Sequence, residues 1–151
     1  MGQRACLRWV RLPLSSADAI QGWFLTPAVR ATDFDDWLVE TFGRVGAFTM
    51  LIVLVAIGET SVALLRSSYL HAIGDETRWP EMARLFAGSG AAWNGAAFFQ
   101  ADRKGLVDDA TAKRRLAALV RQLEKDRAIL REGELFDARG LRLKIEAVDE
   151  R

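Results

Sequence analysis

The sequence is poor in the residues that most often carry chemistry or cross-link a fold. Its 151 residues include one cysteine, Cys6, and one histidine, His71. A single cysteine cannot form a disulfide within the chain, so the fold must depend on its core and suits a reducing, cytoplasmic location. No second nitrogen or sulfur ligand stands at metal spacing from His71, which argues against a zinc site. We therefore expect neither a metal nor a cofactor.

The chain also lacks an excess of charge. It has 21 Lys and Arg residues against 20 Asp and Glu residues, for a formal net charge of +1. A protein that neutralises many phosphates needs a basic surplus, so this balance argues against a nucleic-acid partner. The 50% hydrophobic and 27% charged content is typical of a globular chain. With no repeat and no low-complexity linker, we expect residues 1–151 to form a single domain.

Charge is scarcest over residues 45–65, where Glu59 is the only ionisable residue. Two interpretations stand. In the first, about 48–57 is a buried central strand, apolar on both faces, and Gly58 leads into a helix over 59–73. In the second, 45–65 is a transmembrane helix, long enough to cross about 30 Å of hydrocarbon, and the chain is a single-pass membrane subunit with a soluble C-terminal domain. Apolar runs of this length are more typical of core elements, which favours the first.

Capping signals predict three helices after residue 30. Thr32 and Asp35 have capping-box spacing and begin a helix that ends near residue 45. Pro80 begins a second, which ends before Gly88. The longest runs over about 109–132, and Arg127, inside its apolar stripe, is expected to reach outward or pair with an acid. A second reading of the acids at 33, 35 and 36 is a cation site, but these positions splay around a helical turn.

The two ends of the chain carry further predictions. Arginines at positions 4, 8 and 11 share one helical face, which is typical of an interfacial helix or transit peptide, although solvated arginines on a strand or short helix explain them as well. A capping box at residues 15–18 predicts a helix that stops before Pro27. At the other end, alternation over residues 134–146 around a loop at 137–140 predicts a β-hairpin. Together the elements predict an α/β or α+β fold with a small mixed sheet and flanking helices.

Two surfaces are candidate binding sites. Residues 88–95 form a glycine-rich loop whose spacing fits neither a dinucleotide fingerprint nor a P-loop, so it is expected to lead into a short strand through Phe98 and Phe99. Trp93 and Asn94 lie in it, and an exposed tryptophan would anchor an interface. The second surface is a basic stripe on the long helix, formed by Arg114, Arg121 and Lys125. It suits an acidic partner, or is a solvated helix face beside Glu124, Asp126 and Glu132.

These observations favour a non-enzymatic binding or accessory protein that acts through protein–protein contacts, with a protein partner or a second copy of the chain. The membrane subunit is the alternative, and association with a membrane stays open with it. A small enzyme using Glu59, His71 or Asp75 is a third hypothesis. On the predicted 59–73 helix, His71 lies opposite the apolar face, so an exposed histidine is expected there rather than a general base. The enzyme hypothesis requires that the three side chains converge.

Overall fold

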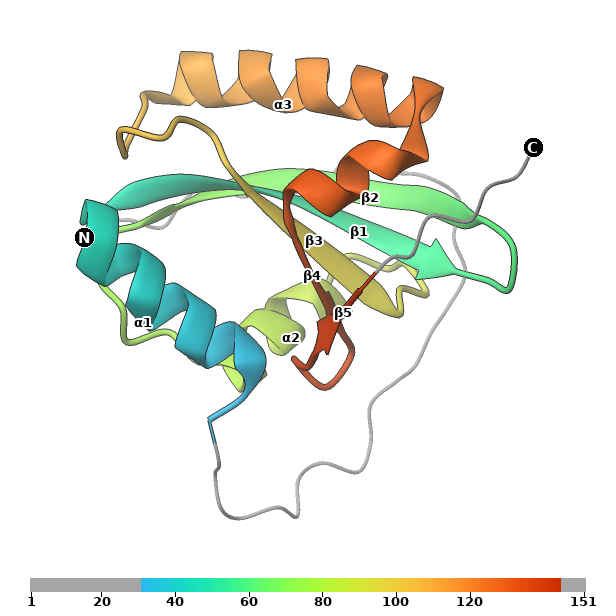
Figure 1. Cartoon of the computed structure of the whole chain (residues 1–151), viewed down its shortest axis with the longest axis horizontal. Coiled ribbons are helices and arrows are strands. Elements are labelled where there is room, and N and C mark those ends of the chain that lie inside the picture. Colours follow the sequence, from blue (N-terminus) through green and yellow to red (C-terminus); the bar gives the residue numbers. More distant parts are fainter. Residues whose placement is uncertain (1–30, 145–151) are drawn as a thin grey trace.

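The computed structural model describes residues 31–144, and it has an α+β fold in which helices cover both faces of one sheet, as predicted (Figure 1). The predicted helix after residue 15, the arginine-rich segment, Cys6 and the end of the hairpin lie outside the described residues. In chain order the elements are α1 (Asp33–Val45), β1 (Phe48–Ile57), β2 (Val62–Ala72), α2 (Trp79–Ala87), β3 (Gly95–Gln100), α3 (Asp109–Lys125), the 3-10 helix η2 (Arg127–Glu132), β4 (Glu134–Asp137) and β5 (Arg142–Leu143).

The five strands lie in the order β2-β1-β3-β4-β5, and every neighbouring pair is antiparallel. The expectation of a mixed sheet was wrong in this respect. Short loops join β1 to β2 and β4 to β5, and strands joined by short loops can only pair antiparallel. The remaining strand, β3, runs antiparallel to both of its neighbours, β1 and β4.

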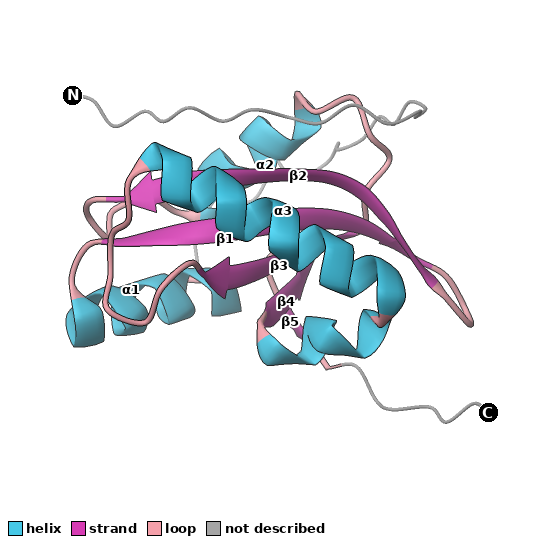
Figure 2. Ribbon diagram, turned by 90° about the horizontal axis from the view of Figure 1, so that it is seen from above, coloured by secondary structure: helices cyan, strands magenta, loops and turns pink. Residues whose placement is uncertain are grey.

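The charge-free segment is a strand, which confirms the first of the two interpretations. β1 lies between β2 and β3, and its first eight residues are buried. Phe48, Met50, Ile52 and Leu54 pack with α1 and α2, whereas the alternate residues Leu51, Val53 and Val55 pack on the side of α3. Figure 2 shows α3 lying over the strands. A transmembrane helix over 45–65 is excluded, and no helix within residues 31–144 combines the length and apolar character needed to cross a bilayer.

The predicted helix over 59–73 was wrong, because this segment is β2. Val62, Leu65, Tyr69 and Ala72 do recur at helical spacing, but the segment pairs along the whole length of β1. Local spacing is a weaker determinant than the backbone bonds and burial that a neighbouring strand offers. Gly58 marks a tight loop, in which its amide donates to the Ser61 carbonyl at 2.8 Å, so residues 58–61 reverse the chain.

The long helix predicted over 109–132 is divided at Asp126. This residue has an extended backbone (φ −149°, ψ 100°), and its side chain accepts a hydrogen bond from the Ala128 amide at the start of η2. The break explains Arg127, whose guanidinium donates to the Leu123 carbonyl at the end of α3 and to the Val62 carbonyl of β2, at 2.7 and 2.6 Å. Arg127 therefore does not reach outward, and it forms no ion pair with an acid within residues 31–144. It ties the end of α3 to the sheet edge.

The predicted C-terminal hairpin is present as β4 and β5 up to residue 143. Its loop packs against the helical layer through Gly140, which has a left-handed φ of +84°. A Cβ atom at this position would lie 2.7 Å from Cγ of Trp79, so the ring of Trp79 needs a glycine beneath it. The Trp79 indole N–H also donates to the Ala138 carbonyl at 3.0 Å. The hairpin loop is thus fixed to the start of α2.

One buried carboxylate joins the two helices on this face. Asp35 is 5% exposed, and one of its oxygens accepts from the Thr32 amide at 3.0 Å, which completes the capping box of α1 as predicted. The other oxygen accepts from the amide of Trp79, the first residue of α2, at 2.8 Å. Because a helix start has backbone N–H groups without helical partners, Asp35 satisfies donors at both helix starts.

We expect Asp35→Ala to lower the free energy of unfolding by about 2–6 kcal/mol, because the buried N–H of Trp79 and the partly buried N–H of Thr32 lose a charged acceptor at roughly 1–3 kcal/mol each. Chemical denaturation measures this. Asp36→Ala is the matched control, since Asp36 is exposed in the same turn of α1. It should cost within about 1 kcal/mol, the usual size of a helix-dipole effect. Equal losses in both variants would contradict the role of Asp35.

Candidate functional site

Trp93 and Asn94 lie where the chain enters β3, and both make contacts within the chain. Trp93 is partly buried, and its ring meets those of Trp79 and Phe86 edge-on, with centroids 6.3 and 5.3 Å apart. The Asn94 side chain accepts from the Ile57 amide at 2.7 Å and donates to the Ile57 carbonyl at 3.1 Å. These contacts fix the loop to the core and to the end of β1. Both residues therefore have a structural role that does not require a partner protein.

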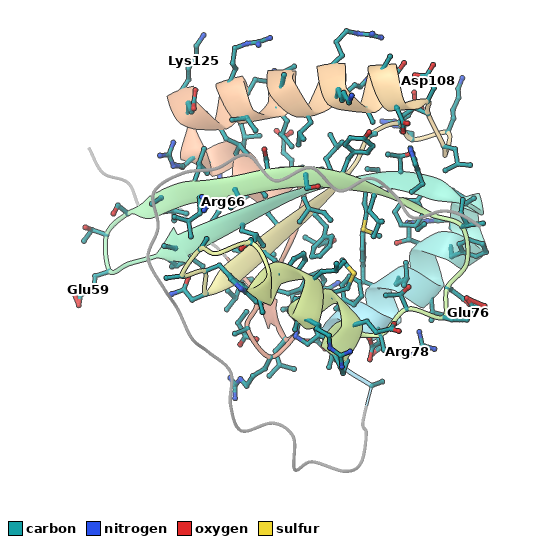
Figure 3. The ribbon with its side chains drawn as sticks, turned by 180° about the vertical axis from the view of Figure 1, so that it is seen from behind. Glu59, Arg66, Glu76, Arg78, Asp108 and Lys125 are labelled. Carbon is teal, nitrogen blue, oxygen red and sulfur yellow. The ribbon has the colours of Figure 1, made fainter. Side chains whose placement is uncertain are left out.

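The basic stripe is on the surface. Arg114, Arg121 and Lys125 are all exposed on α3, and none of them forms an ion pair within residues 31–144. Arg114 makes one weak contact with the hydroxyl of Thr111, at 3.4 Å. Figure 3 shows Lys125 and Asp108 at the two ends of α3, on the outside of the molecule. The predicted stripe is therefore open to a partner.

The residues of the enzyme hypothesis do not converge. Glu59 lies in the β1–β2 loop, next to the Ile57–Val62 pair, whereas His71 pairs with Thr49 near the other end of the hairpin. Asp75 follows β2, and Figure 3 shows its neighbour Glu76 on the opposite side of the molecule from Glu59. The three side chains therefore do not converge on one site, as the enzyme hypothesis requires.

His71 has two partners that the sequence analysis did not identify. Its Nδ1 lies 2.8 Å from Oγ1 of Thr49 on β1, and its Nε2 lies 2.8 Å from Oδ1 of Asp109 at the start of α3. Thr49 Oγ1 also accepts from the Val107 amide at 3.1 Å. An ionised carboxylate only accepts, so Nε2–H donates to Asp109, and when the ring is neutral Nδ1 accepts from the Thr49 hydroxyl. The network joins β1, β2 and α3.

The network holds Asp109 in its charged form. The hydrogen bond from His71 is the largest cause that lowers the pKa of the Asp109 carboxyl, and the charge of His71 and a hydrogen bond from Tyr69 act in the same direction. The Tyr69 ring stands edge-on to the imidazole, with centroids 5.5 Å apart. Asp109 opens α3, where the positive end of the helix dipole also favours a carboxylate.

The order hydroxyl, imidazole, carboxylate is that of a nucleophile activated by a base. In this chain the hydroxyl is inaccessible, because Thr49 is 0% exposed and its oxygen is already bonded to Val107 and His71. A substrate carbonyl cannot approach it without unpacking the sheet. The arrangement acts instead as a polar brace between the sheet and α3.

The surface of the described residues includes two hollows that border α1. The larger, about 410 Å³, lies beneath the end of β2 between α1 and α2, with an apolar floor that includes Leu38, Met50 and Met82. The smaller, about 230 Å³, lies between α1 and the Glu132–Glu134 segment. Within residues 31–144 no group of three His, Cys, Asp or Glu side chains is placed to hold a metal ion. Of the acids at the start of α1, Asp35 caps the helix, and Asp33 accepts a hydrogen bond from the Arg142 amide at 2.7 Å.

Comparison with protein-family models, with curated proteins and with solved structures finds no match to this chain.

We expect Thr49→Val to lower the free energy of unfolding by about 2 kcal/mol, because the Val107 amide and His71 Nδ1 lose their partner inside the fold. Thr41→Val is the matched control. Thr41 is equally buried, at 1% exposed, and its hydroxyl has no partner within residues 31–144. The same change should there raise stability by about 1 kcal/mol, since it removes a buried polar group without a hydrogen bond. Urea denaturation of both variants tests this difference in sign.

The contact between His71 and Asp109 should also make the stability of the fold depend on pH in the acidic range. The lowered pKa of Asp109 means that its contribution is complete above the ordinary carboxyl pKa of about 3.9 and is lost as the pH falls through the lower folded value. Between about pH 5 and pH 3, the Tm of Asp109→Asn should fall less steeply than that of the wild type. His71→Ala should flatten the curve similarly, and the double variant should add little. Parallel curves for all four proteins would contradict the brace.

Proposed function

We propose that the chain is a non-enzymatic binding protein that docks on an acidic surface of a partner protein through the outer face of α3. The observation that carries the proposal is the basic stripe of Arg114, Arg121 and Lys125, exposed and without an ion pair in the described part of the chain. A cytoplasmic location belongs to the same proposal, and its support is the single cysteine.

The charge of α3 differs from that of the rest of the chain. Its 17 residues contain five basic and two acidic side chains, a net charge of +3. Since the whole chain carries +1, the other residues together carry −2. Opposite charge on a partner would raise the rate of association and the specificity for that partner more than it would raise the affinity. The surplus on α3 thus supports an acidic partner.

A protein partner fits this surface better than nucleic acid does. The three basic side chains extend over about 16 Å of a helix, at 1.5 Å per residue, and Glu124 stands among them. A duplex presents a phosphate about every 1.7 Å of its axis, which calls for a denser basic surface without an acid in it. A protein surface with a few spaced carboxylates matches the stripe.

The proposal predicts salt-sensitive binding to an acidic polypeptide. Poly-L-glutamate is the probe, and immobilised wild-type protein should bind it at low salt and release it as the ionic strength rises. Replacing the stripe by Arg114→Glu, Arg121→Glu and Lys125→Glu should abolish this binding. The matched control is Arg84→Glu, Arg139→Glu and Lys144→Glu, which makes the same change in net charge outside α3 and should retain most of it.

Competition identifies the class of partner. Duplex DNA and phosphatidylserine vesicles should displace poly-L-glutamate poorly from the wild-type protein. The proposal fails if either competes better than free poly-L-glutamate, since the stripe would then serve nucleic acid or a membrane. It also fails if the two triple variants lose binding equally, because binding would then follow net charge alone.

A further inference from the structure

Within residues 31–144, one buried side-chain hydroxyl, that of Thr41, lacks a hydrogen-bond partner. Thr41 lies on the inner face of α1 with 1% of its surface exposed, and its Oγ1 forms no hydrogen bond within residues 31–144. Elsewhere in the fold, the buried hydroxyl of Thr49 and both carboxylate oxygens of Asp35 have hydrogen-bond partners. A buried polar group without a partner costs stability, so its presence calls for an explanation. The hydroxyl suggests a partner that is a separate molecule.

Thr41 lines the smaller hollow. This hollow of about 230 Å³ arises where β4 parts from β3, since Phe98 and Glu134 are the last residues of those strands to pair. β3 continues beside β1 to Gln100 without β4, and α1 lies over the gap. Such a volume is below the roughly 300–1,000 Å³ of pockets for drug-sized ligands, so the occupant must be small.

The rim of the hollow is charged with both signs. Glu134 and Arg142 neutralise each other through an ion pair of 2.9 Å. Glu40, Arg44 and Glu132 line the same hollow, are exposed, and belong to no ion pair in the described residues. Two carboxylates and one guanidinium are therefore available beside the buried hydroxyl.

We infer that this hollow binds a free α-amino acid. The carboxylate of the ligand lies against Arg44, whose planar guanidinium suits a bidentate contact. Thr41 and Arg44 are three residues apart on one helix face, so the hydroxyl of Thr41 donates to the same carboxylate. Threonine has two accessible χ1 rotamers in a helix, and a rotation of about 120° between them lets the hydroxyl turn to the ligand. The ammonium group of the ligand lies between Glu40 and Glu132.

The inference is independent of the proposed function, because it uses α1 and β4 instead of α3. Its probes are the twenty standard L-amino acids, screened for a rise in Tm with concentration. At least one should raise the Tm of the wild-type protein. The N-acetylated and carboxamide forms of that amino acid should not, since each lacks one of the two charges. Calorimetric titration then gives the dissociation constant.

Two substitutions test the residues. Arg44→Gln should weaken binding by about ten-fold to a hundred-fold, the equivalent of losing one charge-assisted contact, and Arg44→Lys should restore part of it. Arg121→Gln on α3 removes the same charge elsewhere and should leave binding unchanged. Thr41→Val should also weaken binding about ten-fold while raising the Tm of the free protein by about 2–4 °C. A threonine that served only the fold would not combine weaker ligand binding with a higher Tm when it is replaced.

Two results would contradict the binding of an amino acid at this hollow. If no amino acid raises the Tm of folded wild-type protein, the hollow holds only water and the inference is wrong. If a rise persists in both Arg44→Gln and Thr41→Val, the ligand binds elsewhere and the inference is equally wrong. Circular dichroism confirms that each variant is folded before it is scored.

Discussion

A strand that is apolar on both faces has to be covered on both faces, and β1 imposes this condition on the rest of the chain. Its even-numbered residues face α1 and α2, and its odd-numbered residues face α3. Its backbone also needs a neighbour on each side, which β2 and β3 supply. The three layers, the strand order and the place of every helix follow from burying this one segment.

The two helical layers are held to the sheet by different means. On the face of α1 and α2, aromatic packing dominates, and Asp35 fixes the two helix starts relative to each other. On the face of α3, the packing is mostly aliphatic, with Tyr69 and Phe99 as its aromatic members. Polar contacts hold the helix at its two ends: His71 with Asp109 at its start, and Arg127 with Leu123 and Val62 at its end. The outer face of α3 is thereby left free for charged side chains that the fold itself does not use.

The sequence predicted the elements whose signals are local. β1 follows from a charge-free run, α1 from its capping box and α2 from Pro80, all within about a dozen residues. The prediction failed where the structure of a segment depends on a partner far away along the chain. β2 has a spacing compatible with a helix, and only its pairing with β1 decides the matter. The partners of His71 are 22 and 38 residues away, and the second bond of Asp35 spans 44 residues. The division of α3 depends in the same way on the contact of Arg127 with β2.

The contact between Gly140 and Trp79 restricts how this sequence can change during evolution. Position 140 has a left-handed backbone and no space for a Cβ against the indole. Any descendant that keeps a tryptophan at 79 must therefore keep glycine at 140, and a side chain at 140 becomes compatible only after the ring at 79 has shrunk. Glycine at 140 and tryptophan at 79, sixty-one residues apart, should accordingly change together among distant relatives of this chain.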